Sequence, residues 1–261
     1  MTDHVLIEKS GGVLTLTFNR PEKKNAITPD MYAAFGDAID GAPADPDVRC
    51  ILIQANGDMF TAGNDLADFA AANSDTVAAP AGGERRGGSA LIQALARART
   101  PIVAAVNGRA VGVGTTMLLH CDMVFLAEDA LLTTPFVNLA LVPEAASSIL
   151  LPARIGHARA FSMFVLGEPV PAIKAEAWGI ANAVVPLSDL RARARAAAEA
   201  IASKPPASVA ITKQLMRESE RLGARIQEEG VHFTAQLKSP EAREAFAAFR
   251  EKRPANFSKA T

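Results

Sequence analysis

One carboxylate stands alone in an apolar stretch of the sequence. Glu144 is the only acidic residue between Ala130 and Gly167, and its neighbours are leucine, valine, alanine, phenylalanine and small polar residues. Burial raises the pKa of a carboxyl group, and a proton that exchanges near neutral pH suits a general base. The alternative is an acid in the first turn of a helix over 144–155, stabilised at the surface by the helix dipole. Position alone favours this alternative, but the neighbouring segments reverse the preference.

Two glycine-containing segments can supply hydrogen-bond donors for a substrate. In segment 60–66, Gly63 permits a tight bend that leaves the N–H of Asn64 free. In segment 107–116, a glycine on each side of Val113 precedes a helix expected over 115–121, where free amides and the dipole favour negative charge. The N–H groups of Asn64 and Val113 can together form an oxyanion hole for a carbonyl.

Other catalytic schemes lack their residues. The glycines around Val113 have no third glycine at Met117, so the dinucleotide-binding pattern is absent, as is the Lys-Ser/Thr of a P-loop. No Gly-x-Ser-x-Gly motif occurs, and His120 and Cys121 are adjacent, so they are interpreted as packing or capping residues. Two cysteines and four dispersed histidines give no disulfide framework and no metal site.

The elements that must position these groups follow from hydrophobic patterns. Val13–Phe18 alternates like a half-buried strand, and apolar runs at 50–53, 102–106 and 123–126 are typical of buried parallel strands. Thr28-Pro29 is a helix start. These features predict an α/β fold with a largely parallel sheet. Residues 70–88 predict a loop, either a lid or an insertion. Helices are expected at 144–155, 157–166, 171–178, 188–203, 206–220, 222–238 and 240–251.

Composition limits the partners of this 261-residue chain. Its content of 49% hydrophobic and 21% charged residues allows a full core, and its net charge of −1 gives no reason to expect nucleic acid or an anionic membrane. The arginines of 191–195 are expected on a solvated helix face. No apolar run reaches the length of a membrane span and no signal segment is evident, so a cytoplasmic protein is expected. Residues 1–200 should form a core and 201–261 a helical region of the same functional unit.

Taken together, these motifs resemble those of the crotonase superfamily, which includes enoyl-CoA hydratases and isomerases. The resemblance spans nearly the whole chain, through segments 19–26, 60–66, 107–122 and 239–253. It implies a spiral of β-β-α units with a helical C-terminal region, assembled as a homotrimer or a dimer of trimers. It also implies an acyl-CoA thioester substrate, held through its carbonyl by the Asn64 and Val113 amides. Coenzyme A is then part of the substrate, and no separate cofactor is expected.

Two positions distinguish the reaction types within this family. Hydratases of the family use two glutamates to handle water, and here those positions hold Thr116 and Phe136. Segment 134–144 instead resembles the Δ3,Δ2-enoyl-CoA isomerase branch, in which one glutamate, at the position of Glu144, moves a proton from C2 to C4. Moving the double bond needs no water, so one carboxylate suffices. Glu144 is therefore the expected base and acid.

The resemblance also implies substrate contacts. A basic turn can meet the coenzyme A phosphates or adenine, although a solvated turn explains it equally well; its residues are Arg20, Lys23 and Lys24. The adenine pocket and the acyl site should be bordered by Ala62, Gly63, Asp65, Leu66, Gly112, Phe136 and Leu139, of which Asp65 is also explained as a structural residue. Two alternatives stay open: hydration or another crotonase-type reaction, and acyl-CoA binding without catalysis.

Overall fold

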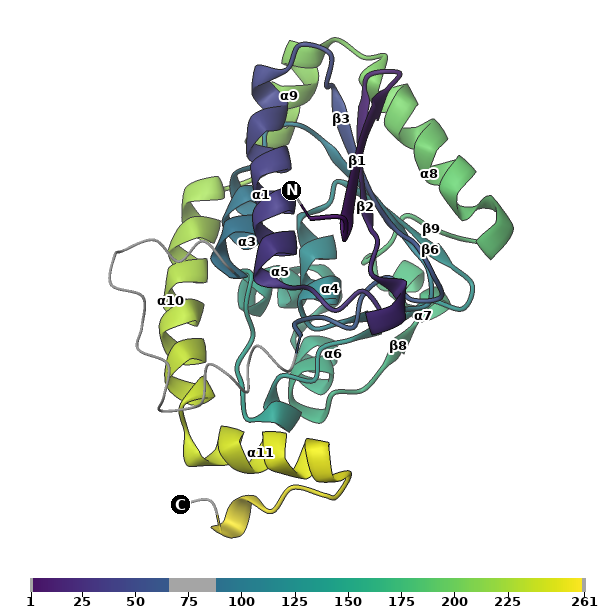
Figure 1. Cartoon of the computed structure of the whole chain (residues 1–261). Helices are drawn as coiled ribbons and strands as arrows, with labels where there is room; N and C mark the ends of the chain where they lie inside the picture. Colours follow the sequence, from purple (N-terminus) through teal and green to yellow (C-terminus); the bar gives the residue numbers. More distant parts are fainter. Residues whose placement is uncertain (1, 66–87, 260–261) are drawn as a thin grey trace.

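A six-stranded sheet forms the centre of the computed structural model, which describes residues 2–65 and 88–259 (Figure 1). The first strand pairs antiparallel with the second, and all the following neighbours are parallel, so the predicted α/β fold with a largely parallel sheet is confirmed. The spatial order is β1 (Val5–Ser10), β2 (Val13–Phe18), β3 (Cys50–Ala55), β4 (Ile102–Val106), β6 (Met123–Ala127) and β9 (Ala183–Val185).

A second, three-stranded sheet alternates with the first along the chain. It consists of β5 (Arg109–Val111), β7 (Leu131–Thr133) and β8 (Val170–Pro171). Since β5 follows β4 and β7 follows β6, the chain passes from one sheet to the other and back, which is the β-β-α repeat expected of a crotonase-like spiral. The helix after β5 is α4 (Val113–Thr116), continued by a 3-10 turn over Met117–His120, so it begins two residues before the predicted range.

Both faces of the main sheet are covered, which explains the continuous apolar runs in its strands. Along β3, Ile51 and Ile53 belong to the core under α1 (Pro29–Gly41) and α3 (Gly88–Arg97). Cys50 and Leu52 pack instead with α8 (Leu187–Ala202), on the opposite side of the sheet (Figure 1).

The second half of the chain is mainly helical, as predicted. Its helices are α5 (Ser147–Ile155), α6 (His157–Phe161, continued by a π-turn over Ser162–Leu166), α7 (Ala172–Ala177), α9 (Pro206–Leu215), α10 (Ser219–Leu237) and α11 (Pro240–Glu251). Shorter 3-10 turns cover Pro21–Lys23, Ala42–Ala44, Val137–Leu139 and Phe257–Lys259. Helix α10 packs against α3, and α11 packs against α10 and the 3-10 turn at Val137–Leu139. The predicted division at residue 200 stays a prediction.

The arginines of 191–195 do more than cover a solvated face. Arg191 donates hydrogen bonds to the Ala55 carbonyl at 2.6 Å, and Arg195 donates to the Ser10 carbonyl at 2.8 Å. They therefore attach α8 to the ends of two strands.

Some expectations concern residues outside the described ranges. Leu66 and the loop expected at 70–88 fall outside the described residues, except for Gly88, which begins α3. Within the described ranges, no helix is both long and apolar enough to cross a membrane. Nor do the described residues gather three or more His, Cys, Asp or Glu side chains into a metal-binding group.

Candidate active site

Glu144 lies in a strained turn and not in a helix, so the expected helix over 144–155 is wrong at its start. Helix α5 begins at Ser147, because Ala145 and Ala146 have φ values of 61° and 54°, in the left-handed region. This conformation costs an L-residue roughly 1–2 kcal/mol. Two such alanines in succession need strong tertiary contacts, and strain of this kind is concentrated at functional sites.

Side chains distant in the sequence hold this turn from two sides. His120 Nε2 donates to the Ala145 carbonyl at 2.7 Å. On the other side, the Glu229 carboxylate of α10 accepts from the amides of Ala146 at 2.6 Å and Ser148 at 3.0 Å. The turn that follows Glu144 thus lies between a neutral donor and an anionic acceptor.

The tautomer of His120 follows from its partners. Arg217 donates to His120 Nδ1 and, at 2.9 Å, to the His120 carbonyl, which leaves Nε2 to carry the proton toward Ala145. Burial, and then the charge of Arg217, lowers the pKa of His120 to about 3. His120 is therefore a neutral structural donor, in keeping with its interpretation as a packing or capping residue, and its partner is the turn beside Glu144.

The carboxyl group of Glu144 has a raised pKa, and its role as a general base stays a prediction. Burial, and then the negative charge of Glu229, raises its pKa to about 8. Part of the residue is exposed, yet Oε1 is shielded from solvent and has no hydrogen-bond partner among the described residues. Glu229 has two amide donors that favour its charged form and oppose the effect of burial, which raises its pKa.

Tyr32 bonds the side chain of Asn64, the residue whose backbone amide is one of the predicted oxyanion donors. Its hydroxyl donates a hydrogen bond to the Asn64 side-chain carbonyl, and the residue is 3% exposed. Burial, and then the charge of Glu144, raises the pKa of Tyr32 well above its usual value. Sequence reasoning missed this residue, although the one tyrosine of the chain was an available signal.

The two glycine segments meet closely. A side chain at Gly63, whose φ is 84°, would put a Cβ 2.7 Å from the Val111 carbonyl oxygen. A Cβ at Gly114 would lie 2.3 Å from the Thr61 methyl carbon. Only glycine therefore allows the two segments to approach each other at this distance.

This approach places the N–H groups of Asn64 and Val113 on neighbouring segments. A parallel bridge pairs Asn64 with Ile27, and its hydrogen bonds use the Gly63 carbonyl and the Asp65 amide, so the Asn64 amide stays outside the bridge. Val113 is the first residue of α4, where amides have no helical partner. Neither N–H donates to another described residue. The oxyanion role of both amides stays a prediction.

The two positions that lack carboxylates are occupied by compact, buried side chains. Thr116 is fully buried and its hydroxyl donates to the Val113 carbonyl at 3.4 Å. Phe136 is 5% exposed and its ring packs 6.1 Å from that of Phe164. Leu139 is partly buried against the same core. Neither Thr116 nor Phe136 can position or activate water as a carboxylate would.

The basic turn is tied into the protein by its charges. Arg20 forms a 2.8 Å ion pair with Asp65, and these side chains are 14% and 21% exposed. Lys24 pairs with Asp58 at 2.7 Å on the surface, and Lys23 is exposed. The Lys24 carbonyl also accepts from the Ala62 amide at 2.9 Å, so the basic turn and the oxyanion segment are attached to each other. Contact of this turn with coenzyme A stays a prediction.

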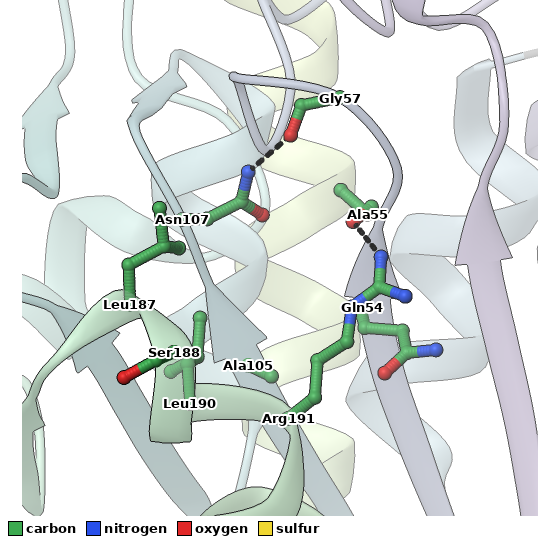
Figure 2. A pocket seen from close by; sticks show the side chains of 9 residues that line it. All are labelled: Gln54, Ala55, Gly57, Ala105, Asn107, Leu187, Ser188, Leu190 and Arg191. Carbon is green, nitrogen blue, oxygen red and sulfur yellow. Dashed lines mark hydrogen bonds between the residues drawn. The ribbon is translucent and has the colours of Figure 1, made fainter.

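A small pocket of about 120 Å³ lies apart from these residues, between α8 and the ends of β3 and β4 (Figure 2). Asn107 and Arg191 line it and donate hydrogen bonds to the carbonyls of two other lining residues, Gly57 and Ala55. None of the predicted site residues lines it.

Comparison with known proteins decides the family. A family model described as enoyl-CoA hydratase/isomerase matches residues 8–260. The chain belongs to this family. Its predicted membership of the crotonase superfamily and its crotonase-like fold are confirmed, and it is an acyl-CoA-processing enzyme of that type.

Relatives within the enoyl-CoA hydratase/isomerase family agree along the whole chain. The 1,2-epoxyphenylacetyl-CoA isomerase of Escherichia coli is 33% identical over 99% of both chains. Enoyl-CoA delta isomerase 2 of Rattus norvegicus is 34% identical over 96% of this chain, which spans 64% of the rat protein. A solved enoyl-CoA hydratase/isomerase from Pseudoalteromonas atlantica superposes with a TM-score of 0.92, at 41% identity over 98% of this chain and all of that one.

Proposed function

We propose that this enzyme isomerises 3-enoyl-CoA thioesters to 2-enoyl-CoA thioesters. The observation that carries the proposal is Glu144, whose shielded, unpartnered Oε1 and raised pKa of about 8 suit a base, together with the absence of a carboxylate at Thr116 and Phe136. Hydration needs groups that position and deprotonate water. Migration of a double bond needs only one group that can accept a proton and return it.

The proposed reaction moves one proton. Ionised Glu144 removes a proton from C2, and the electron pair passes into a dienolate whose oxygen is stabilised by the amides of Asn64 and Val113. The C3–C4 double bond becomes C2–C3 as the carboxylic acid returns the proton to C4, which regenerates the ionised base. A carboxyl group with a raised pKa is a stronger base than an exposed one, and returns its proton near neutral pH.

The same proposal includes the form of the substrate and the assembly. Coenzyme A enters as part of the thioester, so no other cofactor is required. Association of subunits, proposed as a homotrimer or a dimer of trimers, is supported by apolar residues at the end of α9 and just after it, where Ile211, Leu215 and Met216 are 55%, 84% and 83% exposed. Light scattering of the purified protein measures this assembly directly, and a monomer would contradict it.

The decisive experiment replaces Glu144 by glutamine, which keeps the shape but cannot accept a proton. With 3-hexenoyl-CoA as substrate, Glu144→Gln should lower the isomerisation rate at least about 100-fold, the usual lower contribution of general acid–base catalysis. Glu128→Gln, at an exposed acid, is the matched control and should have the wild-type rate. Retained turnover in Glu144→Gln contradicts the proposal. Rapid conversion of crotonyl-CoA to the 3-hydroxyacyl product would show a hydratase instead.

A further inference from the structure

Glu229 has a place in the structure that the reaction described above does not explain. Glu229 lies on α10 and is 6% exposed. Its neighbour on the same helix, Glu228, is exposed and forms a surface ion pair with Arg225 at 3.1 Å. Both carboxylate oxygens of Glu229 instead point into the protein and meet the amides of Ala146 and Ser148. A buried carboxylate is costly unless its partners repay the lost solvation.

We propose that Glu229 is a positioning residue for Glu144, which holds the left-handed turn at 144–146 and presents a fixed negative charge to it. The inference rests on the proposed function, since it assigns Glu229 to the same proton transfer. Glu229 touches no reacting atom in this scheme and acts only through Glu144.

The shape of the turn favours an anionic partner. Helix α5 has no side-chain cap, because its N-cap residue is Ala146. The left-handed turn makes the amides of Ala146 and Ser148 point toward one place, and such a concave set of N–H groups suits an anion. Glu229 occupies this place and acts as the cap that α5 lacks, although it lies 83 residues from Ala146 in the sequence. Its two bonds offset the strain of the left-handed alanines.

Glu229 also brings a charge close to Glu144. A neutral acceptor would satisfy an amide of the turn, yet the chain places a carboxylate there. The groups that act on Glu144 come from two helices: Glu229 on α10, and Tyr32 on α1, whose phenol stays neutral. His120 borders the turn as a neutral donor. Burial raises the pKa of Glu229 above its usual value, although its bonds to Ser148 and Ala146 and the nearby Arg225 oppose the rise. Each carboxylate oxygen of Glu229 accepts from a backbone amide, which favours its ionised form, and this charge favours the protonated form of Glu144.

The test is the pH dependence of kcat/KM for isomerisation, which rises as Glu144 ionises. In the wild type its midpoint should lie near the pKa of about 8. Glu229→Gln removes the charge but keeps one acceptor, so the midpoint should move to lower pH by half a unit or more, with KM changed less than threefold. Glu228→Gln should leave the midpoint unchanged. A purely structural role would lower kcat at every pH without moving the midpoint, and that outcome overturns the proposal.

Two additions keep the test decisive. If Glu229→Gln does not fold, Ala146→Gly relieves the turn, because glycine adopts the left-handed conformation without strain. The midpoints of Ala146→Gly and the double variant are then compared, and equal midpoints overturn the proposal. The protonated-carboxyl infrared band that is lost in Glu144→Gln reports the titration of Glu144 without turnover. It therefore tests Glu229 even if the wild type fails to isomerise 3-enoyl-CoA, a failure that would refute only the proposed function.

Discussion

Replacing Glu144 by glutamine should change how the stability of the enzyme depends on pH. The pKa of this carboxyl group is about 8 in the folded protein and 4.5 when the protein is unfolded. A raised folded-state pKa means that the stability of the protonated form is fully present below pH 4.5 and is lost as the pH rises through about 8. From pH 5 to pH 9 this loss is about 4 kcal/mol, since each tenfold change in proton affinity is worth about 1.4 kcal/mol. Glutamine does not titrate, so the variant should escape the loss.

Urea unfolding of both proteins, followed by circular dichroism at equal protein concentration, measures this difference. The free energy of unfolding of Glu144→Gln relative to wild type should increase by about 4 kcal/mol between pH 5 and pH 9. Groups whose pKa does not depend on Glu144, including the buried His120, contribute equally to both proteins and cancel. If the difference between the two proteins changes by less than about 1 kcal/mol, the carboxyl group is not held protonated by burial, and the argument for a raised pKa is refuted.

Two further substitutions test the framework around the site. Gly114→Ala places a methyl group against Thr61, so α4 must shift away from Thr61. The isomerisation rate should then fall at least about tenfold, because small displacements of catalytic groups lower the rate strongly. Gly223→Ala, where a methyl group meets open space, should be neutral, and equal rates in both variants would contradict the argument. Lys213→Met leaves Asp122 without its 2.7 Å partner and should lower the free energy of unfolding by about 2–4 kcal/mol in urea denaturation, and a change below about 1 kcal/mol would argue against it.

Local patterns predicted the elements of this fold well. The apolar runs became strands because the main sheet is covered on both faces, and the start of α1 follows from Thr28, whose side chain accepts from the Met31 amide at 3.4 Å. The start of α5 could not be predicted locally. Alanine is the best helix former, so Ala145 and Ala146 predict a helix that includes Glu144. Tertiary hydrogen bonds from His120 and Glu229 override that preference.

The site was predictable only in part, for a similar reason. Glu144 was found because an isolated acid in an apolar stretch is visible in the sequence. Glu229 follows Glu228 on a charged helix, and nothing local distinguishes the buried acid from the exposed one. Tyr32 lies on the buried side of α1 beside residues that only fill the core, so its hydrogen bond to Asn64 becomes visible only when the helix is placed. Such contacts depend on topology, which spacing does not encode.

The link between the turn at Glu144 and α10 has a consequence for biosynthesis. Ala146 and Glu229 are separated by 83 residues, so at about 5–20 residues per second a ribosome needs roughly 4–17 seconds to pass from one to the other. During that interval the main sheet can pair, but the amides of the turn have no carboxylate to bind. A nascent chain therefore acquires its catalytic geometry late, when most of its length has left the ribosome. Fragments that end before α10 should fold in part and stay inactive.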